Sequence, residues 1–459
     1  MSSFDYFSGD TIVALATPPG VSALAVLRVS GNEAISLVNQ VFKGKDLTKQ
    51  ETHTLHFGKI VNGESFIDEV LVSVFKAPKS FTGENLVEIS CHGSNYIVAS
   101  VLKLLVSKGG RYANPGEFTR RAFLNGKFDL VQAEAIADLI HSDSEVSHHM
   151  AMNQMRGGFS QKINLLRERL VNFASLLELE LDFSEEDVEF ADRSHLRSLI
   201  EEMQVEIEVL TDSFSLGNVL KEGIPTVIAG KPNAGKSTLL NALLNEEKAM
   251  VSEIAGTTRD VIEDEITISG VKFRFIDTAG LRETKDKLEA MGIERTMKKL
   301  DEASLIIYLY DINSTSEDEL LLVEKDLEIR KKPYLFVANK TDKLQDGEPS
   351  TVNRQLSTVN ISAAKKSNLD ELKSRLLNLV NADSFRSGNT VITNARHHEN
   401  LLKVDATLKL TIEALDKNLS NDFLALEIRQ ALYYLGELTG TITTEDLLGN
   451  IFSKFCIGK

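Results

Sequence analysis

The sequence predicts a multidomain chain of α/β and α segments, with an α/β domain inserted into a helical domain and an α+β domain before both. Changes of pattern along the 459 residues indicate this organisation. Short apolar strands alternate with turns and helices over residues 1–125. Apolar residues then recur every three or four positions over 126–220 and again over 380–459, as in amphipathic helices. Strands and helices alternate over 221–379, and insertion there is plausible because the ends of a domain often lie close together.

The α+β pattern rests on short apolar runs between turn residues. Runs that predict strands are 11–16, 23–29, 55–60, 69–75 and 86–90, and runs that predict helices are 31–42 and 95–108. Cys91 and His92 are neighbours on the last of these strands, so their side chains point to opposite faces. Packing is therefore the better interpretation of Cys91 than a thiol–imidazole pair.

Long helices are predicted on both sides of the α/β segment. The apolar spacing predicts helices over 163–181 and 196–214 before it, and over 398–415 and 422–438 after it. The histidine pairs near these helices fit no metal spacing, and we expect all four to be surface residues: His148, His149, His397 and His398.

A phosphate-binding loop opens the inserted domain. Residues 230–237 match G-x-x-x-x-G-K-[ST], after an apolar run at 224–229 that predicts a strand and before a predicted helix at 238–244. In such loops the backbone N–H groups and the helix N-terminus face phosphate oxygens. The residues expected to bind nucleotide here are Asn233, Ala234, Gly235, Lys236, Ser237 and Thr238, with Lys236 reaching the β- and γ-phosphates and Ser237 binding Mg²⁺.

Guanine is the base that the sequence favours. Asn339, Lys340 and Asp342 form N-K-x-D after the predicted strand 333–338. A carboxylate can accept hydrogen bonds from N1–H and the exocyclic amine of guanine, whereas adenine presents an acceptor at N1. Ser362 and Ala363 follow 358–360 and are expected to form the second loop that contacts the base.

Two further segments complete a Ras-like P-loop GTPase domain. Asp277, Thr278, Ala279 and Gly280 follow the predicted strand 271–276, which pairs with 262–268 through a Ser269-Gly270 turn. The carboxylate can hold the Mg²⁺ shell, and the glycine N–H can meet the γ-phosphate. Upstream, Thr258 supplies a second hydroxyl for Mg²⁺. GTP, Mg²⁺ and hydrolysis are the expectations.

The residue after Asp-Thr-Ala-Gly is Leu281, where small Ras-type GTPases place a glutamine that orients the attacking water. Hydrolysis therefore requires another group to position the water and another positive charge for the transition state. Acidic candidates in the following segment are Glu283, Asp286, Glu289 and Glu294. Each of them could equally be a charge on a solvated helix face, so the residues alone leave this choice open.

Composition limits the partners. The net charge of −16 excludes nucleic-acid binding through bulk electrostatics, so an RNA partner would need a local basic patch or a second protein. No apolar run is long enough to span a membrane, and the first residues lack a basic secretory n-region. Only Cys91 and Cys456 are present, which favours a reducing compartment. We expect a cytoplasmic protein.

Motifs distributed over the whole chain resemble one family. They are Gly-x-Pro-Asn-Ala-Gly-Lys-Ser at 230–237, Gly-Thr-Thr-Arg-Asp at 256–260, Asp-Thr-Ala-Gly-Leu-Arg at 277–282, Leu-Arg-Val-Ser-Gly at 27–31, Ser-Phe-Thr-Gly-Glu at 80–84, Pro-Gly-Glu-Phe-Thr at 115–119 and the final Cys-Ile-Gly-Lys at 456–459. Together they are similar to the tRNA-modification GTPase MnmE (TrmE) family. The terminal motifs are more specific than the GTPase motifs, which many families share.

The resemblance implies a K⁺-dependent GTPase that is activated when its G domains dimerise. K⁺ would take the place of an arginine finger and neutralise the same developing charge. Its expected ligands are Asn233, Ser252, Ile254 and Thr257, and the water-positioning acid of the family falls on Glu289. The nucleotide-contacting segment implied by the family comprises Ser252, Glu253, Ile254, Ala255, Gly256, Thr257 and Thr258.

The resemblance also implies that the N-terminal domain of 1–125 binds 5,10-methylene- or 5-formyl-tetrahydrofolate and takes part in dimerisation. Arg28, Glu88 and Lys127 are implicated by motif position, with Lys459 reaching in and Cys456 nearby as a candidate for modification chemistry. Arg and Lys suit the folate carboxylates, and Glu suits pterin N–H groups.

The implied reaction requires a partner. The homodimer would act with an FAD-dependent MnmG-type protein, as a heterotetramer, to add a carboxymethylaminomethyl or aminomethyl group at C5 of a tRNA wobble uridine.

Two other functions remain as alternatives. A ribosome-assembly GTPase would share the G domain, but it has no reason to carry the terminal Cys-Ile-Gly-Lys or the folate-like residues. An inactive, structural G domain is disfavoured because Lys236, Ser237, Thr258 and Asp277 are all intact.

Overall fold

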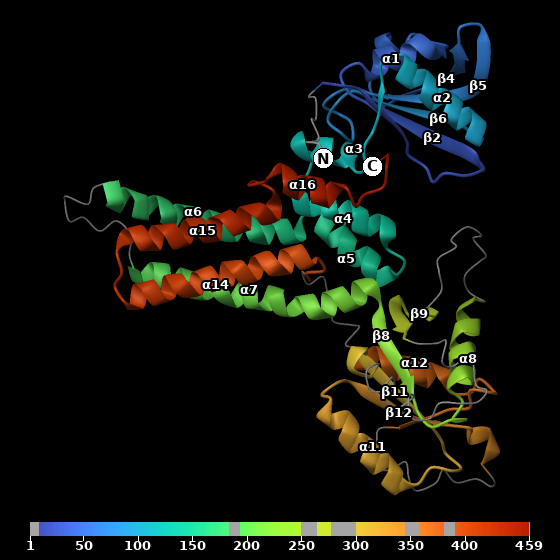
Figure 1. Cartoon of the computed structure of the whole chain (residues 1–459), viewed down its shortest axis with the longest axis vertical. Coiled ribbons are helices and arrows are strands. Elements are labelled where there is room, and N and C mark those ends of the chain that lie inside the picture. Colours follow the sequence, from blue (N-terminus) through green and yellow to red (C-terminus); the bar gives the residue numbers. More distant parts are fainter. Residues whose placement is uncertain are drawn as a thin grey trace. The chain divides into compact units, whose positions relative to one another are not determined.

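A computed structural model describes residues 9–182, 193–248, 264–276, 300–344, 358–380 and 391–458 (Figure 1). The chain divides into two compact units. Unit 1 comprises residues 1–140, 154–201 and 403–459, and unit 2 comprises 141–153 and 202–402. The chain thus leaves unit 1 twice, briefly over 141–153 and then over 202–402, and the longer excursion agrees with the predicted insertion. Within the described ranges, no helix has both the length and the apolar character that crossing a membrane requires.

Unit 1 contains a seven-stranded sheet in the order β3-β4-β5-β6-β2-β1-β7. Its strands are β1 (Ile12–Leu15), β2 (Ser22–Ser30), β3 (Phe42–Lys43), β4 (Thr54–Asn62), β5 (Ser65–Phe75), β6 (Leu86–Gly93) and β7 (Arg111–Tyr112). All neighbours pair antiparallel except β1 and β7. The predicted strands of the N-terminal segment are confirmed. The edge strands β3 and β7 span two residues each, too few to show a period in sequence.

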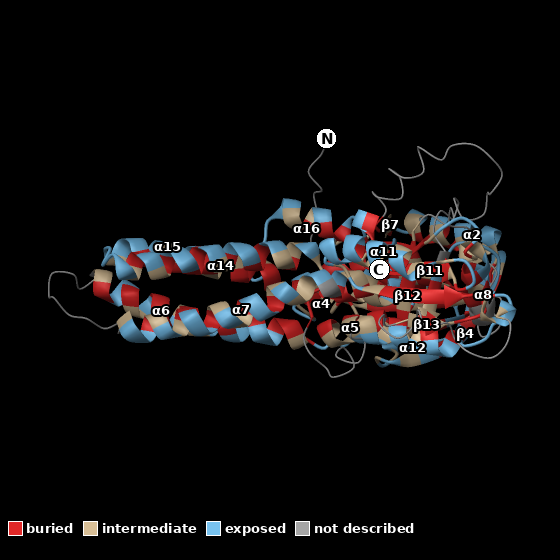
Figure 2. Cartoon of the chain, turned by 90° about the horizontal axis from the view of Figure 1, so that it is seen from below, coloured by how far each residue is buried: buried red, intermediate tan, exposed pale blue. Residues whose placement is uncertain are grey.

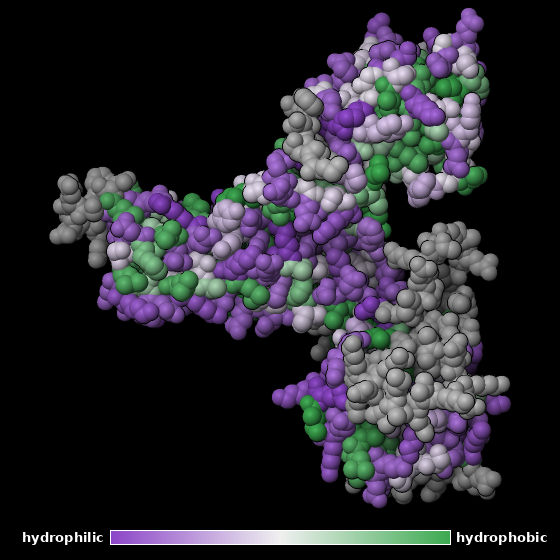
Figure 3. All heavy atoms as spheres, in the orientation of Figure 1, coloured by the Kyte–Doolittle hydropathy of each residue, from purple (hydrophilic) through white to green (hydrophobic). Residues whose placement is uncertain are grey.

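Helices cover one face of this sheet and only part of the other. Leu27, Val72 and Ile89 point to one face, where they form a buried core with helices α1 (Ala34–Val41) and α2 (Asn95–Ser107). Because side chains alternate along a strand, their neighbours point to the opposite face. We call this opposite side the open face. One end of the open face is covered by α3 (Glu117–Leu124), and hydrophobic residues remain on the visible surface of the unit (Figure 3).

The rest of unit 1 is helical. Its helices are α4 (Leu130–His141), α6 (Gly158–Asp182), α15 (Asn421–Thr439) and α16 (Glu445–Phe452). Helices α6 and α15 pack side by side although they are far apart in sequence (Figure 1). The periodic residues that predict α6 are buried, including Ile163, Leu166, Leu170 and Leu177, each with no exposed area. The predicted helices are therefore confirmed.

Unit 2 is built on a six-stranded sheet in the order β13-β12-β11-β8-β10-β9. Its strands are β8 (Ile224–Ala229), β9 (Asp264–Ile268), β10 (Val271–Phe275), β11 (Leu305–Asp311), β12 (Tyr334–Asn339) and β13 (Thr358–Asn360). Only β9 and β10 pair antiparallel. The central strands are buried (Figure 2), and the helices in the described part of this unit include α5 (Glu145–Met155), α8 (Lys236–Lys248), α11 (Glu317–Ile329) and α12 (Leu369–Leu379).

Two long helices belong to both units by their residues. Helix α7 (Arg193–Glu222) begins in unit 1 and runs into β8, and α14 (Ala395–Asp416) begins in unit 2 and ends in unit 1. In unit 2 these segments pack tightly, because a Cβ added at Gly217 would lie 2.2 Å from the Ile392 carbonyl oxygen. The sequence-based expectation of a P-loop domain inserted between helices is confirmed.

Two predictions on single residues have different outcomes. Cys91 is buried, and His92 Nδ1 instead donates to Asp68 Oδ1 at 2.8 Å, so the packing interpretation is confirmed. His397 was expected at the surface, and this is wrong, because its side chain is 1% exposed. Successive helix residues point in different directions, so His397 faces inward while His398 stacks on Phe214 with centroids 4.3 Å apart.

Candidate nucleotide and cofactor sites

The phosphate loop lies between the end of β8 and the first turn of α8. Three of its residues have left-handed backbone: Gly230 at φ +145°, Asn233 at +63° and Gly235 at +100°. A Cβ at Gly230 would come 2.0 Å from the Leu309 carbonyl oxygen, so only glycine allows β11 to approach the loop this closely. The resulting curl directs backbone N–H groups toward the space in front of α8, as anion binding requires.

Lys236 is the first residue of α8, and its ammonium is turned back onto the loop. Nζ donates to the carbonyl oxygens of Gly230 at 2.7 Å and Lys231 at 2.9 Å. Burial lowers the pKa of Lys236, because the charged form loses hydration there. A phosphate would offer this desolvated ammonium a full negative charge in place of two carbonyl dipoles. Ser237 and Thr238 follow in the same turn, with Ser237 half-buried and Thr238 exposed.

Asn339 connects the phosphate loop to the loop that is predicted to contact the base. Its side chain is buried, and Nδ2 donates to the Ala234 carbonyl at 2.8 Å. Its Oδ1 accepts from the N–H of Ala363 at 3.0 Å. A Cβ at Gly235 would lie 2.3 Å from Nδ2, so the loop must carry glycine here. The amide of Asn339 thus holds the two loops at a fixed separation.

Asp342 and Ser362 meet at the predicted guanine site. The Ser362 hydroxyl donates to Asp342 Oδ1 at 2.5 Å. This hydrogen bond lowers the pKa of the Asp342 carboxyl, so the group is an anion at neutral pH. An oriented carboxylate at the edge of β12 is the acceptor that guanine N1–H and its amine need.

Asp311 is a site residue that the sequence-based prediction missed. It ends β11, and its Oδ2 lies 2.7 Å from Nζ of Lys340. Lys340 has left-handed backbone at φ +68°, which turns its side chain back across the loop. An acid at the end of a buried apolar strand, beside N-K-x-D, is a signal that could have identified it.

Several predicted nucleotide residues lie outside the described residues. They are Ser252, Glu253, Ile254, Ala255, Gly256, Thr257, Thr258, Asp277, Thr278, Ala279, Gly280 and Glu289. Of the proposed Mg²⁺ and K⁺ ligands, Ser237 and Asn233 are described. No cluster of three or more His, Cys, Asp or Glu side chains suited to a metal occurs in the described part of the chain.

A second site lies on the open face of the unit 1 sheet, where β2 and β6 bring Arg28 opposite Glu88. Arg28 Nε and Nη2 donate to Glu88 Oε1 at 3.0 and 2.8 Å. The guanidinium carbon lies 5.3 Å from the ring centroid of Phe81 and 5.7 Å from that of Phe118. Two aromatic rings and a charged pair therefore enclose this point, and the sequence-based prediction missed both phenylalanines.

The C-terminal segment ends at the same place. Arg28 Nη1 donates to the Gly458 carbonyl at 3.2 Å, and the Gly116 N–H donates to that of Cys456 at 3.3 Å. Gly458 has φ +95°, and a Cβ there would lie 2.3 Å from the Leu15 carbonyl oxygen. Cys456 is exposed, and Lys459 lies outside the described residues.

Lys127 lies beside the β5–β6 loop that carries Phe81. Its Nζ donates to the Pro78 carbonyl at 3.2 Å, and its side chain is exposed. A Cβ at Gly83, in the same loop, would lie 3.5 Å from Lys127 Cδ. The structure therefore brings Arg28 and Glu88 into direct contact and places Lys127 on the adjoining loop.

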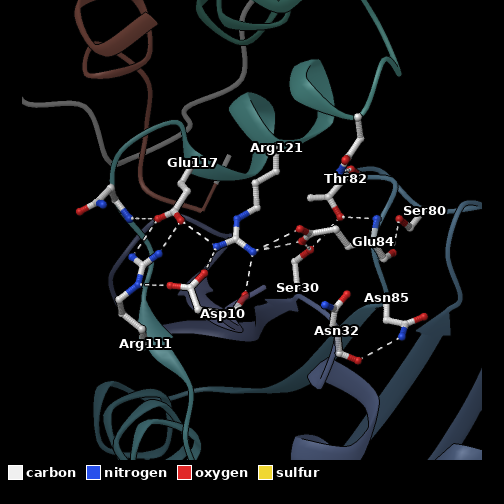
Figure 4. Close-up of polar contacts among 12 residues, drawn as sticks. Asp10, Ser30, Asn32, Ser80, Thr82, Glu84, Asn85, Arg111, Glu117 and Arg121 are labelled. Atoms are coloured by element: carbon white, nitrogen blue, oxygen red, sulfur yellow. Dashed lines mark hydrogen bonds and ion pairs between the residues drawn. The ribbon is translucent and has the colours of Figure 1, made fainter. Parts of the chain in front are cut away.

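A charged network fixes this loop against α3 (Figure 4). Arg121 contacts Glu84 at 3.2 Å and Glu117 at 3.0 Å, and it also pairs with Asp10. Arg111 contacts Glu117 at 2.6 Å and Asp10 at 2.7 Å. Burial would raise the pKa values of Glu117 and Asp10, but hydrogen bonds and charges from the two arginines outweigh it and lower both. The site is thus built on a rigid support.

Comparison with known families matches nearly the whole chain. Residues 130–456 match a family described as MnmE helical domain, and residues 11–127 match GTP-binding protein TrmE N-terminus. A tRNA modification GTPase MnmE of Cytophaga hutchinsonii is 57% identical over 450 residues, covering 98% of each chain. The protein of the same name from Flavobacterium johnsoniae is 55% identical over 462 residues, covering 98% of this chain and 99% of that one.

The chain also shows similarity to two solved G domains. The FeoB G-domain from Methanococcus jannaschii is 22% identical and covers 35% of this chain and 98% of its own, with a TM-score of 0.26. The G domain of the Thermotoga maritima FeoB iron transporter is 23% identical, covering 34% of this chain and 98% of its own, also at 0.26.

Proposed function

Because this chain belongs to the MnmE family of tRNA modification GTPases, we propose that it couples GTP hydrolysis in unit 2 to a tRNA modification supported by unit 1. Asn339 carries this proposal, because it joins the phosphate loop to the loop beside Asp342. Such a brace is of use only where one ligand presents phosphates and a base at a fixed separation.

Nucleotide binding would change the partners of Lys236. Its ammonium, which is already half-buried, would leave the Gly230 and Lys231 carbonyls for the β- and γ-phosphates. Ser237 would bind Mg²⁺ together with Thr258. Asp342, held ionised by Ser362, would select guanine. These steps require no rearrangement of the described strands.

K⁺ is proposed as the cation that completes the transition-state charge. Leu281 cannot orient water, and an isolated P-loop domain without an arginine finger hydrolyses GTP slowly. Asn233 is exposed in the phosphate loop and could bind K⁺ with oxygens of Ser252, Ile254 and Thr257. Glu289 would position the water, and contact between two G domains would exclude solvent from the site.

The K⁺ proposal is tested by GTP turnover in K⁺ and in Na⁺ at equal ionic strength, for the native chain and Glu289→Ala. We expect strong stimulation by K⁺ that Glu289→Ala abolishes while GTP still binds. Equal turnover in the two salts would exclude a cation in this role. Glu294→Ala serves as the control, because this acid lies in the same segment and has no proposed part in hydrolysis.

Tetrahydrofolate is proposed as the cofactor of unit 1, as its 5,10-methylene or 5-formyl form. The site fits it, because the Arg28 guanidinium, held over the rings of Phe81 and the buried Phe118, can bind a carboxylate, and Glu88 can accept from pterin N–H groups. Arg28, Lys127 and Lys459 would bind its carboxylates. When bound, the cofactor supplies the one-carbon unit. Cys456 lies near Gly116 and is the proposed nucleophilic or proton-carrying side chain.

A homodimer is proposed to form through the open face of the unit 1 sheet. Phe57 and Leu71 lie directly opposite each other on β4 and β5, and their side chains are 65% and 42% exposed. Leu55 and Leu24 are also exposed, at 60% and 63%. Phe57→Asp should therefore give monomers in sedimentation or light scattering, whereas Leu322→Asp, on α11 of unit 2, should not.

The modification itself requires a second protein. We propose an FAD-dependent MnmG-type partner, and together the two would add a carboxymethylaminomethyl or aminomethyl group at C5 of the wobble uridine in the cytoplasm. With a net charge of −16 this chain repels RNA at long range, so the partner would provide most of the contacts to the tRNA phosphates.

A further inference from the structure

The β9–β10 hairpin lies in the chain between the two segments predicted to contact the γ-phosphate and Mg²⁺. Thr258 lies six positions before Asp264, the first residue of β9. Strand β10 ends at Phe275, two positions before Asp277. Its turn has left-handed backbone at Ser269 (φ +48°) and Gly270 (φ +83°), the geometry of a tight two-residue hairpin. Movement of either segment would therefore be transmitted to this hairpin.

Lys272, on β10, ties the hairpin to a segment from much earlier in the chain. Its Nζ lies 2.8 Å from Asp143 Oδ2 and 2.8 Å from Glu265 Oε2, and its side chain is 11% exposed. Its aliphatic carbons lie over Gly223, at the junction of α7 and β8. Burial would lower the pKa of Lys272, but the hydrogen bonds to Asp143 and Glu265 outweigh it and raise that pKa, so the ammonium stays charged.

Helix α5, which follows Asp143, packs as part of unit 2. The Val146 N–H donates to the Gly270 carbonyl at 3.1 Å. The Val146 side chain is buried in the same core as Ile268 and Val271. A Cβ at Gly270 would lie 2.8 Å from that of Glu145, so the turn and the helix are in close contact.

The start of α5 is itself fixed. The N–H of Ser144 donates to the Ser147 hydroxyl at 3.2 Å, and the N–H of Ser147 donates to the Ser144 hydroxyl at 3.1 Å. This reciprocal pair caps the helix. Residues on both sides of 141–153 belong to unit 1, so α5 is joined to that unit by two covalent connections. Helix α5 therefore contacts the hairpin within unit 2 and is joined through the chain to unit 1.

We propose that Lys272 is a positioning residue that links GTP hydrolysis to tRNA modification, by holding the β9–β10 hairpin against Asp143 at the start of α5. This rests on the proposed function. Lys272 is not among the residues proposed to bind nucleotide or cofactor. The two carboxylates that pair with Lys272 have different roles. Glu265 pairs with it inside the hairpin, and Asp143 connects the position of the hairpin to α5.

The two halves of this contact can be separated by substitution. Asp143→Asn removes the pair to α5, and Glu265→Gln removes the pair within the hairpin, from carboxylates of nearly equal exposure, 49% and 47%. Lys272→Met removes the ammonium and keeps the aliphatic packing, and Lys272→Arg keeps the charge. Lys417→Met is the control for the same change at an exposed helical pair, with Glu413.

Two quantities are measured with the full chain and its FAD-dependent partner. They are the rate of GTP turnover and the yield of modified uridine per GTP hydrolysed. Lys272→Met and Asp143→Asn should keep GTP turnover within about threefold and lose about tenfold in modification per GTP, a coupling of the usual size. Lys272→Arg, Glu265→Gln and Lys417→Met should retain both. An unchanged yield of modified uridine per GTP for Lys272→Met, or equal effects of Glu265→Gln and Asp143→Asn, would overturn the proposal.

Hydrogen exchange gives a readout that needs no tRNA. In the native chain, the α5 amides, Val146 included, should differ in protection between GDP and GDP with aluminium fluoride, and Asp143→Asn should remove the difference. An α5 that does not respond to nucleotide in the native chain contradicts the proposal. A response that Asp143→Asn removes, without any uridine modification, would instead contradict the proposed function and support transmission from the hairpin to α5 alone.

Discussion

Replacing Asn339 by alanine should lower the local unfolding free energy of the phosphate loop and of the loop around Ala363. The side chain makes two buried hydrogen bonds, to the Ala234 carbonyl and from the Ala363 N–H. Each bond contributes about 1 kcal/mol net, and each partner left buried without a bond costs about 1–3 kcal/mol. Partial rehydration of the loops reduces the sum, so we expect a loss of about 2–4 kcal/mol in the local unfolding free energy.

The assay is native-state hydrogen exchange of the β8 and β12 amides in the full chain without nucleotide, together with GTP affinity. Asn313→Ala is the matched control, because that amide is exposed and bonds to Asp311 and the Lys340 carbonyl. We expect it to cost under about 1 kcal/mol, as for an exposed hydrogen bond. A loss for Asn339→Ala no larger than the control, with unchanged GTP affinity, would refute the bracing role.

Further predictions concern unit 1. Arg28→Ala should weaken tetrahydrofolate binding at least about tenfold in calorimetry, with Arg28→Lys intermediate because Lys lacks the planar fork; Lys59→Ala, at the exposed pair with Glu69, should have no effect. Glu117 has a pKa lowered from 4.5, so its stabilisation is present above pH 4.5 and is lost as pH falls through the folded value. As the pH falls below 4.5, the unfolding free energy of Glu117→Gln should therefore decrease less than that of the native chain. An equal decrease with pH in both proteins would contradict the network. Gly116→Ala combines φ +66° with a Cβ 2.5 Å from the Phe452 carbonyl oxygen, and should cost about 1–3 kcal/mol and deprotect α16 amides.

Local sequence predicted the strand and the helix that flank the phosphate loop, because this pattern is local. An apolar run, a glycine loop and a helix follow one another from 224 to 248, and the structure has β8 and α8 there. The Leu305–Asp311 strand is equally apolar and could have been recognised by the same rule. Asn339 was identified by motif, but its brace joins residues far apart in sequence and is visible only in three dimensions.

The unit 1 site could not be derived from local pattern. Arg28, Glu88, Phe81 and Phe118 lie on different elements, and only the strand register brings the first two together. The family resemblance identified the charged pair and gave no reason to choose the aromatic residues. Likewise, the predicted first part of the helical domain, 126–220, includes α5, whereas Val146 packs in the core of unit 2. The placement of α5 depends on a tertiary contact, which local sequence propensity cannot predict.

The central claim is that GTP hydrolysis in this chain drives modification of a wobble uridine. The most direct measurement is mass analysis of nucleosides from tRNA incubated with the full chain, an FAD-dependent MnmG-type partner and a tetrahydrofolate one-carbon donor. We expect the C5-substituted uridine with GTP, and none with a non-hydrolysable GTP analogue or with Lys236→Met. Equal modification with GTP and with the analogue would contradict the account.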